Sequence, residues 1–393
     1  MNKEVNRSKI KISDILHIKV ELHWTFIMLL LFALFISAYS GLYFFVIIVL
    51  LFLMVLIHEF AHSATALANN IEVKKIILLP LGGASIIDLD NVKPSISLKI
   101  ALAGPVMSIL LGLLCGIIAI IAPPVMLTQW LGVPVSIVTI FQILFILNIL
   151  LGIFNLLPAF PLDGGRVMKS ALERKHDNFT ATKLAVKISN IILVIFIVGS
   201  IIYELTIPGM SISYFTFVLI WDLIIVFFIY GGAQSELDMA YIIKYASNIK
   251  ASTAVSKDYI VVKPYTKMKD LYNQILKKGT HIAVFSSIDN GKLNVYAVAA
   301  RLPNSSASNY IKQAAMLEKT VSDYKVKIPY INYNAPLSKA IEKMRYEGAS
   351  IMALVRNNKV VGVLNLQHVE SIIALHLPLE IQKDKQRDIQ TNK

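Results

Sequence analysis

The chain has 393 residues, of which 56 % are hydrophobic and only 16 % charged, with a mean hydropathy of +0.64 and a formal net charge of +13. This composition excludes an ordinary soluble domain and indicates an integral membrane protein. The single cysteine, Cys115, excludes a disulfide framework and a cysteine-based zinc site.

The long apolar runs all lie before Gly231, and the rest of the chain has the composition of a soluble domain. We therefore predict a multi-pass α-helical membrane protein with a C-terminal α/β domain. The predicted parts are a basic N-terminal segment (1–23), a membrane domain (24–232), a soluble domain (245–378) and a polar, disordered tail (379–393).

Six apolar runs are candidates for membrane helices, each of which needs about 20 residues. They cover residues 24–40, 43–66, 98–122, 136–157, 186–203 and 212–230. Lys and Arg precede the first run and follow the second and fourth, whereas the other connections between runs contain neither. The positive-inside rule then places both termini in the cytoplasm of a cell-membrane protein. Basic loops that face an anionic lipid bilayer account for the net charge without nucleic acid as a partner.

The second run contains the motif HEFAH, from His58 to His62. The two histidines stand at i and i+4 and share one helical face, with Glu59 beside the first. Two imidazoles and a carboxylate that can activate water are what a zinc hydrolase requires. Ionisable groups inside membrane helices are rare and usually functional, which favours a metal site over buried polar residues with a structural role.

The connection after this run, residues 71–90, places PLGG between two stretches rich in β-branched residues. This pattern predicts a β-hairpin, and the alternative is an irregular cytoplasmic loop.

A zinc site built on two histidines needs a third protein ligand, and Asp163 is the strongest candidate. It stands in NLLPAFPLDGG, where prolines end the fourth run and glycines permit a tight turn. By the predicted topology the second and fourth runs both point inward, so the three side chains lie at similar depth. The alternative is that Asp163 only caps the helix that follows it.

HEFAH together with NLLPAFPLDGG resembles the site-2 protease family of intramembrane zinc metalloproteases. LAGPVMS in the third run resembles another family stretch, in which many members have Asn in place of Ser108. The resemblance implies a prokaryotic-type enzyme with one Zn²⁺ held by His58, His62 and Asp163, and with Glu59 as the general base. Its substrate would be a membrane-anchored protein, cut within or near the transmembrane segment in regulated intramembrane proteolysis.

The resemblance also implies two sets of substrate-binding residues. Asn155 would contact the substrate peptide or the developing oxyanion, and the alternative is a helix–helix hydrogen bond. The predicted hairpin, with Gly82 and Gly83, would bind an extended substrate by strand addition. Asp222, inside the sixth run, is a further functional candidate, for which structural hydrogen bonding is the alternative.

The soluble domain contains an imperfect repeat at an offset of 69 residues. Five positions correspond: Met268, Tyr272, Ile275, Gly279 and Ile282 match Leu337, Ile341, Met344, Gly348 and Ile351. Each copy reads as helix, glycine, strand, turn, strand, which resembles a pair of CBS domains. Such pairs bind adenine nucleotides through Ser or Thr and Asp after the last strand. VAARLPNS and GVLNLQHVES lack that pattern here, which argues against nucleotide binding. A homodimer through the pair is compatible with the sequence.

Two other functions are compatible with these features. One is a transporter or channel regulated by the CBS-like pair, with an intramembrane histidine cluster. The other is a catalytically inactive homologue that acts as a binding module, although the complete set of His58, Glu59, His62 and Asp163 argues against it.

Overall fold

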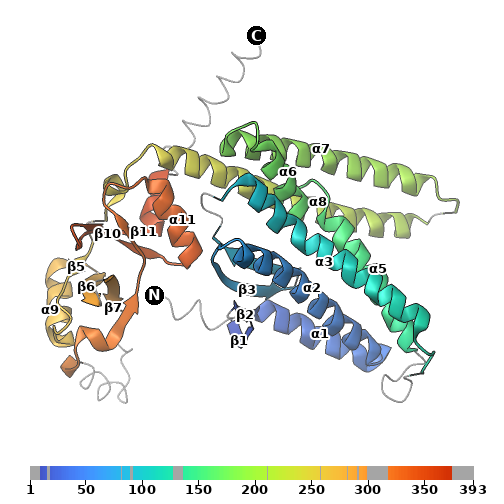
Figure 1. Cartoon of the computed structure of the whole chain (residues 1–393), viewed down its shortest axis with the longest axis horizontal. Helices are drawn as coiled ribbons and strands as arrows, with labels where there is room; N and C mark the ends of the chain where they lie inside the picture. Colours follow the sequence, from blue (N-terminus) through green and yellow to red (C-terminus); the bar gives the residue numbers. More distant parts are fainter. Residues whose placement is uncertain are drawn as a thin grey trace, which may run out of the picture. The chain divides into compact units, whose positions relative to one another are not determined.

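The structure is a computed structural model that describes residues 9–15, 18–80, 82–88, 92–126, 136–209, 211–256, 258–280, 282–289, 292–298 and 317–373. It divides into two compact units, a membrane unit within Asn2–Ala240 and a C-terminal unit within Tyr241–Lys393 (Figure 1). The predicted disordered tail, 379–393, lies outside the described residues.

The membrane unit contains an apolar helix at each of the six predicted runs. In chain order these are α1 (Trp24–Ser40), α2 (Tyr43–Ala68), α3 (Pro94–Ile121), α5 (Ile137–Asn155), α7 (Asn178–Leu205) and α8 (Ile212–Ser247), the last turns of which, from Tyr241, belong to the C-terminal unit. Within the described residues, all but α1 are long and apolar enough to cross a membrane, and α1 is a shorter apolar helix of 17 residues. The prediction of a multi-pass α-helical membrane protein is therefore confirmed.

Two helices extend well beyond their apolar runs. The helix α7 begins eight residues before its predicted start at 186, and α8 continues to Ser247 instead of ending at 230. At 1.5 Å per residue the 36 residues of α8 span about 54 Å, more than the roughly 30 Å of a hydrocarbon core. Hydropathy marks only the part of a helix that lies in lipid, so polar turns that continue the helix are missed.

The helix α3 lies at the centre of the membrane unit and packs against α2, α5 and the short helix α6 (Asp163–Leu172) (Figure 1). Its neighbours contribute apolar side chains to shared clusters, such as Cys115 of α3 with Ile140 and Leu144 of α5. Through these contacts α3 lies between the helix that carries HEFAH and the helix that begins at Asp163.

A four-stranded sheet packs against α2. The strands are β1 (Lys9–Ile15), β2 (Ile18–His23), β3 (Val73–Leu79) and β4 (Gly82–Ile87), in the spatial order β1-β2-β3-β4. Strands β3 and β4 form the hairpin that the PLGG pattern predicts, whereas β2 pairs with β3 in parallel.

The strands β1 and β2 were not predicted, because the basic residues of 1–23 were assigned to a flanking segment. In the structure the apolar side chains of Ile18 and Val20 alternate with polar ones and are buried. Ile18 joins the cluster formed by α2, β3 and α3, which includes Ala66 and Ile76. Residues 9–15 and 18–23 are therefore part of the folded membrane unit.

The C-terminal unit has the repeat that the sequence predicts, a helix and a hairpin in each copy, and each copy also begins with a short strand that was not predicted. The first copy comprises β5 (Ile260–Val261), α9 (Met268–Lys278), β6 (Ala283–Asp289) and β7 (Lys292–Val298). The second comprises β9 (Tyr330–Asn332), α11 (Leu337–Glu347), β10 (Ile351–Arg356) and β11 (Lys359–Asn365). A short strand, β8 (Lys325–Lys327), pairs with β7.

Matching positions in the two copies have matching conformations. Gly279 and Gly348 both end their helices with positive φ, of 65° and 60°. Side chains from both copies share one apolar cluster, with Val284 and Val295 beside Val355 and Val363. The two copies thus form one folded unit.

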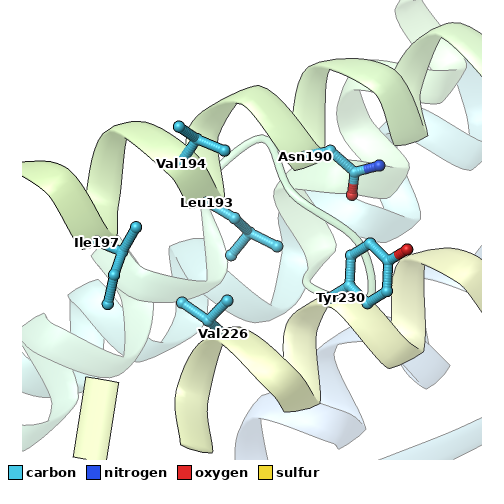
Figure 2. A pocket seen from close by; sticks show the side chains of 6 residues that line it. All are labelled: Asn190, Leu193, Val194, Ile197, Val226 and Tyr230. Atoms are coloured by element: carbon cyan, nitrogen blue, oxygen red, sulfur yellow. The ribbon is translucent and has the colours of Figure 1, made fainter. Parts of the chain in front are cut away.

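The helices α7 and α8 line a small apolar pocket of about 200 Å³ that is partly open at the surface (Figure 2). Its walls are Asn190, Leu193, Val194, Ile197, Val226 and Tyr230. Elsewhere between these helices, Asp222 of α8 accepts a hydrogen bond from Ser200 of α7. This contact supplies a structural partner for Asp222.

Candidate metal centre

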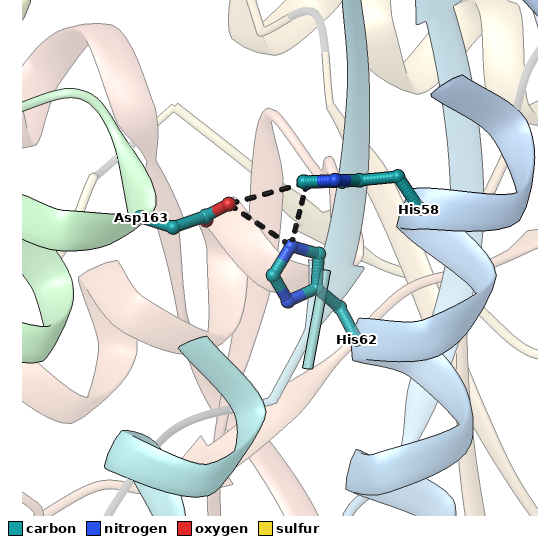
Figure 3. Close-up of side chains that lie close together, drawn as sticks. All are labelled: His58, His62 and Asp163. Carbon is teal, nitrogen blue, oxygen red and sulfur yellow. Dashed lines mark hydrogen bonds and ion pairs between the residues drawn. The ribbon is translucent and has the colours of Figure 1, made fainter. Parts of the chain in front are cut away.

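His58 and His62 lie in the C-terminal half of α2 and point to the same side, as their i, i+4 spacing requires (Figure 3). Both are buried, with about 5 % and 8 % of their side chains exposed. They face Asp163, the first residue of α6, whose side chain is 12 % exposed.

The loop before α6 brings Asp163 to this position. The helix α5 ends at Asn155, and Pro158 and Pro161 in the loop that follows cannot continue it. The loop is held by the fully buried ring of Phe160 and by a hydrogen bond of 3.0 Å from the Phe160 amide to Ser189 Oγ of α7. The structure thus brings the two motifs together, as the sequence predicts, while their depth in the membrane stays a prediction.

The three side chains direct one ligand atom each to a common point. His58 Nε2 and His62 Nε2 are 3.1 Å apart, and each lies 3.2 Å from Asp163 Oδ2 (Figure 3). A tetrahedral zinc ion with ligand bonds of about 2.0 Å separates its ligand atoms by about 3.3 Å. The observed triangle therefore fits one face of such a tetrahedron, with the fourth position open.

The other ring nitrogen of each histidine is hydrogen-bonded. His62 Nδ1 lies 2.6 Å from the carbonyl oxygen of Ile100, which can only accept, so Nδ1 carries the proton and Nε2 presents its lone pair. His58 Nδ1 lies 2.8 Å from Ser108 Oγ, and a proton on Nδ1 frees Nε2 in the same way. Both partners belong to α3, which thereby orients the two rings as outer hydrogen bonds do in metal sites.

The electrostatics of Asp163 favour the ionised form that a metal ligand needs. Burial by itself would raise the pKa of this carboxyl, but the closeness of the His58 and His62 rings, with the nearby charge of Arg166, holds it well below its usual value.

Gly104 of α3 lies directly against the two ligand nitrogens. A Cβ atom at this position would be 2.2 Å from His62 Nε2 and 2.5 Å from His58 Nε2. Such distances are shorter than any ordinary contact, so a side chain here would occupy the space between the ligands. The LAGPVMS stretch by itself assigns no role to Gly104, because the approach of this residue to α2 depends on how the helices pack.

Glu59 is 8 % exposed and lies beside the strand β4. Its carboxylate accepts a hydrogen bond of 2.6 Å from Ser85 Oγ. A Cβ atom on Gly83 would be 2.3 Å from Glu59 Cγ, so Gly83 lets the strand approach this side chain. Gly82, also expected to bind substrate, has a φ of 140° at the start of β4 and open space around it.

The structure does not connect Asn155 to this group within the described residues. Asn155 is the last residue of α5, and its amide nitrogen donates to the Leu151 carbonyl of the same helix at 3.0 Å. Neither a helix–helix bond nor a contact with His58, His62 or Asp163 is recorded for it.

Comparison with known proteins gives two family matches. Residues 46–132 and 120–198 match the family described as Peptidase family M50, and residues 321–374 match the CBS domain. The first match covers α2, α3, α5 and Asp163, and the second covers the second copy of the repeat.

Curated relatives match over most of the chain. Zinc metalloprotease MJ0392 of Methanocaldococcus jannaschii is 27 % identical over 357 residues, which are 91 % of this chain and 93 % of the relative. The putative zinc metalloprotease Rip3 of Mycobacterium tuberculosis is 22 % identical over 333 residues, 84 % of this chain and 80 % of the relative. Among solved structures, the site-2 protease from Methanocaldococcus jannaschii is 29 % identical, with a TM-score of 0.43, and covers 58 % of this chain and 95 % of that chain.

Proposed function

Because the chain belongs to the site-2 protease family, peptidase family M50, and carries a C-terminal CBS pair, we propose that it is a zinc-dependent intramembrane endopeptidase. Its substrate is a membrane-anchored protein, cut within or near the transmembrane segment in regulated intramembrane proteolysis. The zinc ligands are His58, His62 and Asp163, and Glu59 is the general base.

One observation supports this proposal above the others. The ligand atoms of His58, His62 and Asp163 form a triangle with edges of 3.1–3.2 Å, which suits a zinc ion with one open position. Glu59 follows the first ligand directly in the sequence and stands at the same end of α2. A bound zinc ion would supply a Lewis acid that polarises the scissile carbonyl and lowers the pKa of a water molecule.

The residues of the chain perform the remaining chemistry. The Glu59 carboxylate accepts the proton of the attacking water and later donates it to the leaving amine. Asn155 contacts the substrate or the developing oxyanion, after its side chain leaves the intrahelical bond to Leu151.

The substrate must be extended at the cleavage site, because the carbonyl groups of a helix are hydrogen-bonded and shielded. Among the described residues, β4 is the last strand of its sheet, and no other strand pairs with its outer edge. We propose that the substrate pairs with this edge near Gly82 and Gly83, as in other cases of strand addition. Since Gly83 already lies against Glu59, the paired segment would lie near the general base.

The orientation and the partners follow from the sequence and remain proposals. The distribution of Lys and Arg places both termini in the cytoplasm. The CBS pair is a candidate homodimer interface, and the missing Ser/Thr and Asp pattern argues against adenine nucleotides as its ligands. The first of the two diagnostic segments, VAARLPNS, lies largely outside the described residues.

The test compares Glu59→Gln with Asp163→Ala in purified full-length protein, using a panel of transmembrane-segment substrates with and without a zinc chelator. Glu59→Gln should retain zinc and lose cleavage, because an amide cannot accept the proton. Asp163→Ala should lose both zinc and cleavage. Wild-type protein that binds no zinc and cleaves no substrate would support the transporter or channel instead. Wild-type protein with zinc but without cleavage would support the inactive homologue.

A further inference from the structure

The hydroxyl of Ser85 joins the strand β4 to the carboxylate of Glu59. Ser85 Oγ donates to Glu59 Oε2 at 2.6 Å and lies 3.2 Å from the Glu59 carbonyl oxygen. Ser63, one helical turn after Glu59 on α2 and fully buried, donates to Ser85 Oγ at 3.2 Å. With that donor in place, the proton of the Ser85 hydroxyl is directed to the carboxylate.

The backbone of β4 also restricts the position of the Glu59 side chain, through the close approach of Gly83. Gly83 and Ser85 are two residues apart in a strand, so they face the same side of the sheet. The Cα of Gly83 approaches Glu59 so closely that an added Cβ would be 2.3 Å from Cγ, 2.9 Å from Cδ and 3.1 Å from Oε1. The Glu59 side chain is thus held between its own helix and one face of β4.

We propose that Ser85 is a positioning residue for the general base, an inference that rests on the function proposed above. The charge-assisted hydrogen bond holds Oε2, so that Oε1 keeps one direction for the water from which it takes a proton. A glutamate side chain turns about several bonds, and without this bond only packing restrains the carboxylate. A shift of about 1 Å in a reacting group can lower the rate by about 100-fold.

The arrangement connects base position with substrate binding. The strand that carries Ser85 is the sheet edge at which we propose that the substrate pairs. A substrate that orders β4 would therefore also order the hydroxyl that holds Glu59. Within the part of the chain that the structure describes, the Ser85 hydroxyl is hydrogen-bonded to Glu59 and Ser63 and to none of the three proposed zinc ligands, so its effect on the rate is separable from metal binding.

The experiment measures kcat, KM and zinc content of the full-length protein and of Ser85→Ala, Ser85→Thr and Thr65→Ala. Ser85→Ala should lower kcat by about 10- to 100-fold, with KM within about twofold and zinc content unchanged. Ser85→Thr keeps the hydroxyl and should restore most of the rate. Thr65 is the matched control, because its hydroxyl lies on α2 but bonds only the Ala61 carbonyl, so Thr65→Ala should behave as wild type.

Two results would overturn the inference: a wild-type kcat in Ser85→Ala, whether or not KM changes, or a Ser85→Thr variant as slow as Ser85→Ala. If Ser85→Ala does not fold, Ser85→Cys takes its place as a nearly isosteric, weaker donor, with the same expected direction and the same refutations. The proposed function is tested separately, since a wild-type protein that loads zinc and cleaves nothing in this assay refutes it without reference to Ser85.

Discussion

Replacing Gly104 by alanine should abolish metal binding at the proposed zinc site with a single methyl group. The added Cβ would lie 2.2 Å from His62 Nε2 and 2.5 Å from His58 Nε2, where an ordinary contact is at least 3.4 Å. One or both rings must therefore move by about 1.2 Å, the difference between 3.4 and 2.2 Å. Zinc–ligand distances tolerate about 0.2 Å, so the ligand triangle cannot survive this shift.

The size of the effect can be bounded from below. Losing one outer hydrogen bond of a metal ligand lowers metal affinity by about 10- to 100-fold. Displacing the ligands themselves is the larger perturbation, so zinc affinity should fall by more than about 100-fold and cleavage should fall with it. Helix propensity acts in the opposite direction, because alanine is favoured over glycine by about 1 kcal/mol inside a helix.

The assay is the zinc content of purified protein after dialysis against a weak chelator, with cleavage of a transmembrane substrate and thermal unfolding measured on the same samples. Gly199→Ala is the matched control, since Gly199 lies inside α7 and an added Cβ meets nothing within 4 Å. The control should bind zinc as wild type. A folded Gly104→Ala protein with wild-type zinc content and activity would refute the packing of α3 against the two histidines.

Two further predictions concern the orientation of a ligand and of the chain. Ser108→Ala removes the hydrogen-bond partner of His58 Nδ1, so zinc affinity should fall by about 10- to 100-fold. Ser108→Asn keeps an acceptor and should recover part of that affinity. Equal zinc affinity in the wild type and both variants would contradict this role of Ser108. In an accessibility assay on intact cells, a reporter fused after Lys250 should be cytoplasmic, and a reporter inserted at Val125 should be external. Finding both reporters on one side of the membrane would contradict the six-helix topology.

The sequence by itself determined the features that depend on local periodicity. The six apolar runs locate α1, α2, α3, α5, α7 and α8, because a helix in lipid needs a continuous length of apolar side chains. The i, i+4 spacing places His58 and His62 on one face whatever surrounds the helix. The repeat in the C-terminal unit was visible for the same reason, since each copy encodes the same short elements.

The placement of Asp163 was predicted partly from the sequence and depends partly on the tertiary structure. The sequence singled it out because prolines and glycines mark a helix end and because the topology matched its depth to that of the histidines. The 3.2 Å distances to both Nε2 atoms come from the tertiary structure, through the packing of α3 against α2 and α6.

Only the tertiary structure decided what surrounds the proposed ligands and the base. Each of these side chains has a hydrogen-bond partner far away in the sequence. His58 and Ser108 are 50 residues apart, and His62 and the Ile100 carbonyl are 38 residues apart. Glu59 and Ser85 are 26 residues apart, and no local pattern encodes such pairs. The role of Gly104 also could not be predicted from the sequence, because a glycine in an apolar helix is required only where another helix packs closely against it.

The N-terminal strands β1 and β2 are elements that the sequence did not predict. The sequence IKVELH of β2 alternates apolar and polar residues, but the basic residues before it, its own Lys19 and its place before the first membrane helix favoured a basic flank. It becomes a strand because β3, more than fifty residues later, offers a parallel partner, with Val20 opposite Ile76. A helix forms its backbone hydrogen bonds between residues four apart, whereas a short strand depends on a distant partner for them. The helices of this protein could therefore be predicted from the sequence, and two of the four strands of the membrane-unit sheet could not.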